Sequence, residues 1–128
     1  MLGDFPWTGT GFGAFRRVFP HYLPTGESDL WLQLHNDYLE VLVDGGLVAG
    51  LLVAWLAWGF WSRALSSLLR DGGPRRRLAR TGLVLGLACL SAHALVDFNH
   101  QTPANALLFV VASALALREA AAPGEGGR

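Results

Sequence analysis

The sequence contains no lysine, a single cysteine and few charged residues of any kind. Its basic residues are all arginine, and charged residues make up 16% of the 128 residues, against about 25% in ordinary soluble domains. One cysteine, Cys89, cannot form an internal disulfide framework. A formal net charge of zero excludes the basic footprint of a nucleic-acid-binding protein, and a hydrophobic content of 52% excludes a wholly disordered chain. At this length the residues form at most one compact domain.

Charged residues are missing from three long stretches, over residues 45–62, 81–96 and 98–117, although the last begins with several polar residues. A helix needs roughly 20 mainly apolar residues to cross the hydrocarbon core of a bilayer. None of the stretches has the polar stripe of an amphipathic helix in a soluble protein. We therefore predict an all-α polytopic membrane protein with two to three transmembrane helices, at about 46–63, 81–97 and 103–117. The third is short enough to be a buried helix, and the core of a soluble α-domain is the alternative for all three.

The arginines indicate a topology. Six of them lie between residues 63 and 80, and the positive-inside rule predicts that this loop is cytoplasmic. Residues 1–44 then lie outside the cytoplasm as a loop and an amphipathic helix. The C-terminal tail, residues 118–128, returns to the cytoplasm, and its low-complexity end is predicted to be disordered.

The N-terminal residues lack the features of a secretory signal. They include neither a basic region nor an apolar core of the required length. Because a segment without a preceding span is not easily translocated, we expect this chain to be the C-terminal fragment of a longer membrane protein. Three helices are too few to enclose a large lipid carrier, so we expect catalysis to require the parent protein.

A glycine-rich segment occupies the predicted outer side. Gly9, Gly11 and Gly13 alternate with other residues, and such a pattern permits unusual backbone angles and close approach. It predicts either a backbone nest that binds an anionic group or an ordinary turn-rich loop. Arg16 and Arg17 follow directly; their planar guanidinium groups match phosphate oxygens, with simple solvent exposure as the alternative.

A helix is predicted from Leu30 to the first apolar stretch. His35 falls on its apolar face, opposite an arc of polar side chains. Histidine changes its charge near neutral pH and suits proton transfer, whereas a buried histidine with a hydrogen-bond partner is the structural alternative.

A second group of polar residues precedes the last apolar stretch. His93, Asp97 and His100 are spaced so that one helical face would carry all three. Because no fourth ligand is evident, we expect no metal ion there. A hydrogen bond between His93 and Asp97 is the simplest expectation, and ionisable groups near a membrane boundary are often functional.

Three segments together resemble the O-antigen ligase and polymerase superfamily. These are GTGFGAFRRVFPHY, LHNDYLEVLVDGGLVAGLLV and AHALVDFNHQTPANALLF, and the resemblance covers about residues 3–117. One departure is visible: the family often has a glycine three residues after the position of Gly46, where this chain has Ala49.

The resemblance implies a function in bacterial cell-envelope polysaccharide and lipopolysaccharide biosynthesis. Members are glycosyltransferases of the inner membrane that move a glycan from undecaprenyl pyrophosphate to lipid A core, a growing glycan or a protein, on the periplasmic side. The implied roles are an acceptor base for His35, pyrophosphate binding for Arg16 and Arg17, and no metal or other cofactor. Asn36 and Tyr38 are expected to contact substrate, and Asp97 and His93 to orient His35 or line the acceptor path.

Two other functions stay open at this point. A transport or transport-accessory subunit would use the histidines and Asp97 to line a polar path. A small structural membrane protein would carry no catalytic residue.

Overall fold

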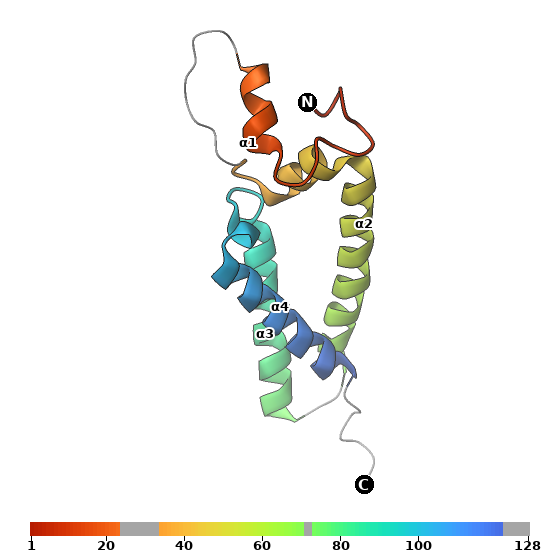
Figure 1. The fold of residues 1–128 in the computed structure, drawn as a ribbon. Helices are drawn as coiled ribbons and strands as arrows, with labels where there is room; N and C mark the ends of the chain where they lie inside the picture. The colour runs from red at the N-terminus through yellow and green to blue at the C-terminus, as the bar shows by residue number, and fades with distance from the viewer. Residues whose placement is uncertain (24–33, 71–72, 122–128) are drawn as a thin grey trace. The chain divides into compact units, whose positions relative to one another are not determined.

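The computed structural model describes residues 1–23, 34–70 and 73–121. These residues form helices joined by turns, with no strand among them, so the predicted all-α fold is confirmed. The elements, in chain order, are α1 Phe15–Val18, η1 Phe19–Tyr22, α2 Asp37–Leu68, α3 Pro74–His93, η2 Asn99–Gln101 and α4 Pro103–Ala121 (Figure 1). The chain divides into two compact units, one made of residues 1–55 and 94–98 and the other of residues 56–93 and the described residues after 98.

Helix α2 begins later than the apolar pattern predicted. Leu30, the predicted start, lies outside the described residues, but residues 34–36 are not helical and α2 starts after Asn36. The side chain of Asn36 accepts a 3.0 Å hydrogen bond from the backbone N–H of Leu39, which is the bond of a helix N-cap. His35 therefore precedes the helix instead of lying on its apolar face.

Helix α2 is interrupted at Gly46. This glycine has φ 66° and ψ −167°, so two helical segments meet there at a break in the backbone. A break of this kind frees carbonyl groups on one side and N–H groups on the other from their helical partners. These groups are bonded by residues of the N-terminal segment, which comprises residues 1–23.

Helix α3 ends at His93, short of the predicted second span. The carbonyl of Ala94 accepts a 3.0 Å hydrogen bond from the N–H of Asp37, and the carbonyl of Leu95 accepts a 2.8 Å bond from the side-chain amide of Asn36. These carbonyls are thus satisfied by the start of α2, and the helix does not continue through them.

Much of the segment predicted to be a loop, residues 63–80, is helical instead. Helix α2 extends to Leu68 and α3 starts at Pro74. Arginine, leucine and alanine, which dominate this segment, are good helix formers. Proline is favoured at the first helical position, where its missing N–H costs no bond.

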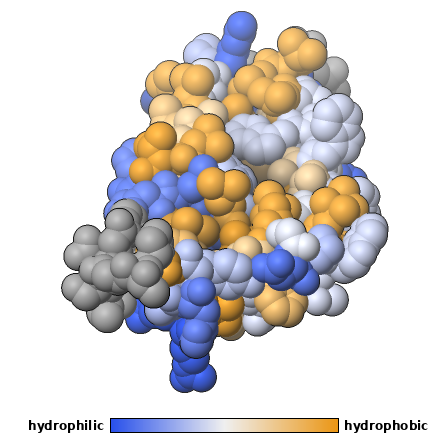
Figure 2. Space-filling model, turned by 90° about the horizontal axis from the view of Figure 1, so that it is seen from above, coloured by the Kyte–Doolittle hydropathy of each residue, from blue (hydrophilic) through white to orange (hydrophobic). Residues whose placement is uncertain are grey.

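Helices α2 and α4 are long and apolar enough to cross a membrane. Fewer than one residue in five of their apolar stretches is buried within the described structure, so they are not the buried core helices of a soluble fold. Figure 2 shows apolar side chains at the surface of the face that it presents. Helix α3 does not meet the same criterion, because its first two turns carry four arginines and the apolar part after them is short. The third predicted span, which lies in α4, is therefore a better candidate for a transmembrane helix than the second, which lies in α3.

The second unit packs α3 against α4 and against the end of α2. The buried side chains there are mostly small, which lets helices approach closely; they are Ala64, Ser67, Val84, Leu87, Ala116 and Ala120. Arg80 is also buried and donates a 2.8 Å hydrogen bond to the carbonyl of Ser67. Arg70 donates to the carbonyl of Ala120. These two bonds tie the end of α2 to α3 and α4.

Candidate functional site

The N-terminal segment pairs with the backbone of α2 on both sides of the break at Gly46. On one side Thr10 N–H donates to the carbonyl of Val43 at 3.0 Å, and Gly11 N–H donates to that of Asp44 at 2.8 Å. On the other side the freed N–H groups of α2 donate to carbonyls of the segment. These two bonds run from Leu47 to Pro6 at 2.8 Å and from Val48 to Trp7 at 3.2 Å. The break and the segment therefore satisfy each other's backbone groups.

Two glycines make this close approach possible. Gly9 and Gly46 both have φ 66°. A Cβ atom on Gly9 would lie 2.3 Å from the backbone of Asp44, and one on Gly46 would lie 2.4 Å from the backbone of Trp7. Only residues without a side chain fit at these two positions.

The glycine-rich segment binds an anion, and that anion is the carboxylate of Asp44. Gly13 N–H donates to Asp44 Oδ2 at 2.7 Å, and the hydroxyl of Thr10 lies 3.4 Å from Asp44 Oδ1. Gly11 and Gly13 have positive φ angles of 104° and 75°. Asp44 was not predicted to be a site residue. The sequence signal that could have identified it is an acidic residue followed by two glycines inside an apolar run.

Helix α1 follows Gly13 directly and carries the arginine pair. Its first residue, Phe15, is 2% exposed and stacks on Phe19 with ring centroids 4.8 Å apart. Arg16 and Arg17 are both exposed. The aromatic pair thus anchors one side of this short helix, whose two arginines lie at the surface.

His35 is exposed and lies immediately before the N-cap of α2. Its ring meets that of Phe98 edge to face, with centroids 5.5 Å apart and an angle of 63°. Its neighbour Asn36 uses its side-chain amide on Leu95 and its side-chain oxygen on the helix backbone. Tyr38, the second residue of α2, is exposed. The amide of Asn36 therefore holds the backbone beside His35.

His93 and Asp97 do not share a helical face with His100, so that prediction is wrong. Helix α3 ends at His93, Asp97 lies in the following turn and His100 lies in η2. His93 Nδ1 is 2.6 Å from the side-chain amide nitrogen of Asn99, and Asp97 Oδ1 accepts a 2.8 Å hydrogen bond from Phe98 N–H. Both side chains thus have structural hydrogen bonds at the end of α3.

Metal ligands do not gather in the part of the chain that the structure describes. Within residues 1–23, 34–70 and 73–121, no three His, Cys, Asp or Glu side chains lie close enough together to hold an ion.

Two contacts position the candidate residues. Gly13, three residues before Arg16, donates a hydrogen bond to Asp44. The ring of His35 packs against Phe98, at the end of residues 94–98.

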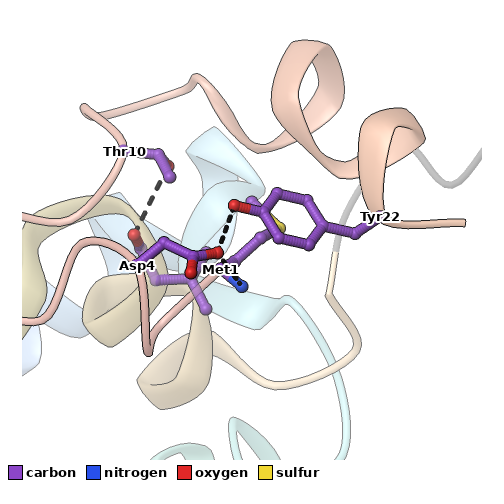
Figure 3. A network of polar contacts seen from close by, with 5 residues as sticks. Met1, Asp4, Thr10 and Tyr22 are labelled. Carbon is purple, nitrogen blue, oxygen red and sulfur yellow. Dashed lines mark hydrogen bonds and ion pairs between the residues drawn. The ribbon is translucent and has the colours of Figure 1, made fainter.

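A hydrogen bond between Tyr22 and Asp4 joins the two ends of the N-terminal segment (Figure 3). The hydroxyl of Tyr22 donates to Asp4 Oδ2 at 2.5 Å. This bond, assisted by the amino group of Met1, lowers the pKa of the Asp4 carboxyl. The same bond raises the pKa of Tyr22, because it stabilises the protonated hydroxyl.

Replacing Tyr22 by phenylalanine is expected to raise the pKa of Asp4 toward its ordinary value. Because the folded-state pKa of Asp4 is lowered, the contact stabilises the segment above the ordinary pKa of aspartate and is lost as the pH falls through the lowered value. NMR titration of the labelled aspartate carboxyl carbons measures this shift. Tyr38→Phe is the matched control and should leave the Asp4 titration unchanged; identical Asp4 midpoints in wild type and Tyr22→Phe would contradict the prediction.

Residues 1–54 match the family model described as O-antigen ligase. This segment, less than half of the chain, is similar to the O-antigen ligases. The matched residues include five of the candidate positions, namely Arg16, Arg17, His35, Asn36 and Tyr38. His93 and Asp97 lie beyond the match. No curated protein and no solved structure matches the chain.

The match and the exposed apolar helices agree on where this O-antigen ligase-like chain resides. Two helices, α2 and α4, have the length and composition of membrane spans. Apolar surface of this extent is unusual on a monomeric soluble protein. The O-antigen ligase-like chain is therefore a membrane protein.

Proposed function

We propose that this chain acts as part of an O-antigen ligase-like membrane protein that transfers a glycan from undecaprenyl pyrophosphate to an acceptor, which is lipid A core, a growing glycan or a protein. The observation that carries the proposal is the family match over residues 1–54. This segment holds both exposed arginines and the exposed His35. Without that match the same residues would be equally compatible with a binding role.

The arginine pair supplies the electrostatic part of the reaction. Arg16 and Arg17 bind the pyrophosphate of the carrier, whose negative charge increases as the bond to the glycan breaks. Planar guanidinium groups form paired, charge-assisted hydrogen bonds with phosphate oxygens. Donors that face a developing charge stabilise the transition state more than the ground state.

His35 supplies the proton transfer. The imidazole accepts the proton of the acceptor hydroxyl as that oxygen attacks the first sugar of the glycan. Asn36 acts beside it by fixing the backbone, since both ends of its amide are already bonded to protein groups. Tyr38 remains a candidate for substrate contact because its side chain is exposed at the same end of α2. The proposal gives a supporting role to Asp97, which lies in the turn before Phe98, and to His93, the last residue of α3.

The proposed topology places residues 1–44 in the periplasm, and residues 63–80 and the C-terminus in the cytoplasm of a bacterium with an inner membrane. The arginines around the end of α2 and the start of α3 support it through the positive-inside rule. In the proposed topology α3 also crosses the membrane, although it is less apolar than α2 and α4.

The exposed arginine pair provides the test of the proposed function. In a strain that lacks the gene, the double substitution Arg16→Gln and Arg17→Gln is expected to restore less than about one tenth of the wild-type glycan transfer, because two charge-assisted contacts to pyrophosphate are removed. Electrophoresis of the glycosylated acceptor and mass spectrometry of the carrier lipids measure the two ends of the reaction. The carrier-linked glycan should accumulate as the acceptor-linked glycan disappears.

The matched control is the pair Arg75→Gln and Arg77→Gln, two exposed arginines of α3 on the opposite side of the proposed membrane. This control should transfer glycan at the wild-type rate. Wild-type transfer by the Arg16 and Arg17 variant at equal protein levels would overturn the proposal. A gene deletion that changes solute uptake but leaves the carrier lipids unchanged would instead favour a transport subunit.

A further inference from the structure

Asp44 is a buried carboxylate in the apolar part of the chain. It is 4% exposed and lies two residues before the break in α2. A carboxylate is costly to bury unless hydrogen bonds replace its water. Here those bonds come from Gly13 N–H and, at longer range, from the hydroxyl of Thr10.

The bond to Gly13 has a direct consequence for helix α1. Gly13 is three residues before Arg16, and the intervening turn is closed by Ala14 N–H, which donates to the carbonyl of Gly11 at 2.9 Å. The backbone bonds of Thr10 and Gly11 hold the segment before this turn. Of the contacts to α2 described above, that of Asp44 with Gly13 is the nearest in sequence to the arginine pair.

We propose that Asp44 is a positioning residue that fixes the start of α1 and so holds Arg16 and Arg17 in place for the pyrophosphate of the carrier. This inference rests on the proposed function. Asp44 does not touch substrate; it acts through Gly13 and the turn that leads into α1. The backbone bonds of Thr10 and Gly11 to Val43 and Asp44 hold the segment without the carboxylate, so we expect loss of the Asp44 side chain to affect the arginines more than the fold.

The consequence of losing the carboxylate is specific. The arginines would remain on the chain but would sample more positions, so binding of the pyrophosphate would become weaker. His35, the proposed general base, is held by other contacts, so its position should not change. The KM for the carrier-linked donor should therefore rise, while the KM for the acceptor should not.

Two substitutions of Asp44 should weaken the positioning of the arginines to different degrees. Asp44→Asn keeps an oxygen that accepts from Gly13 N–H but removes the charge, whereas Asp44→Val keeps a similar volume and removes every side-chain hydrogen bond. The donor KM is expected to rise about tenfold in Asp44→Val, the factor that corresponds to about 1.4 kcal/mol. Asp44→Asn should lie between this value and the wild type. Glu119→Gln is the control, because Glu119 is a carboxylate of α4 that pairs with Arg76 in the other unit.

Trypsin cleavage gives a second readout that does not depend on catalysis. The enzyme cuts after arginine, and cleavage of the full protein in detergent after Arg16 or Arg17 is detected by the mass of the released N-terminal fragment. Faster cleavage in Asp44→Val, an intermediate rate in Asp44→Asn and no change in Glu119→Gln are expected. Faster cleavage together with a higher donor KM supports the proposal.

Other outcomes overturn it in distinguishable ways. Unchanged cleavage and unchanged donor KM in both Asp44 variants, at wild-type protein levels, would show that the carboxylate does not position the arginines. A fall in kcat with no change in donor KM would place the role of Asp44 elsewhere. If the wild-type protein transfers no carrier-linked glycan, the proposed function fails and this inference fails with it, while the cleavage rates still report whether Asp44 fixes α1.

Discussion

Replacing Gly46 by alanine is expected to release the N-terminal segment from α2 and to destabilise the unit that contains residues 1–55. The backbone of Gly46 has φ 66° and ψ −167°, a region of backbone angles that is almost confined to glycine. A Cβ atom there would also lie 2.4 Å from the carbonyl group of Trp7 and 2.5 Å from the nitrogen of Gly9. Because these are backbone atoms, no side-chain rotation relieves the contact.

The two effects add to a large cost. A side chain in a left-handed conformation costs about 1–2 kcal/mol, and overpacking adds typically about 1–3 kcal/mol. The free energy of unfolding of the unit should therefore fall by about 2–5 kcal/mol. Thermal unfolding in detergent, followed by near-ultraviolet circular dichroism, measures this loss, and cleavage by trypsin after Arg16 reports release of the segment.

The matched control for this substitution is Gly82→Ala in α3. No atom lies within 4 Å of the Cβ position of Gly82, and its backbone is helical. Alanine should there stabilise the helix by up to about 1 kcal/mol. Equal unfolding temperatures for Gly46→Ala and the wild type would refute the close approach of the segment to α2.

The helices were predictable because their signals are local. Missing charges marked the apolar parts of α2 and α4, and proline marks the start of α3 and of α4. The end of α3 was not predictable from local pattern. It depends on Asn36 and Asp37, which bond the carbonyls of residues 94 and 95 far away in sequence. The same bonds set the start of α2. One long-range contact therefore accounts for the two helix boundaries that were predicted wrongly, the start of α2 and the end of α3.

The candidate site was predictable in part for the same reason. The spacing of Gly9, Gly11 and Gly13 was compatible with an anion-binding backbone or with an ordinary turn-rich loop, and in the structure the N–H of Gly13 bonds a carboxylate. The identity of the anion was not accessible, because Asp44 is 31 residues away from Gly13 and only the fold brings them together. The exposure of His35 likewise depends on the cap formed by Asn36, which a simple helical projection of the sequence does not include.

Replacing His35 by phenylalanine is expected to abolish glycan transfer while leaving the fold intact. Loss of a general base typically lowers a rate by about 10²–10⁴-fold. Phenylalanine keeps an aromatic ring that packs edge to face against Phe98, as His35 does at 5.5 Å, but it cannot accept a proton. The measurement is the initial rate of transfer from the carrier-linked glycan to the acceptor by the full protein in detergent.

A pair of further variants separates chemistry from packing. His35→Ala removes both the proton acceptor and the ring contact with Phe98, so it should lose transfer to the same extent as His35→Phe and also unfold at a lower temperature. His21→Ala, an exposed histidine in η1, should retain the wild-type rate and is the matched control. If His35→Phe transfers glycan at the wild-type rate, the ring of His35 has a packing role only and the base must be sought elsewhere. If His35→Phe is inactive, with an unfolding temperature equal to the wild type and an unchanged KM for the carrier-linked donor, the imidazole acts in the chemical step, because neither the fold nor donor binding has changed.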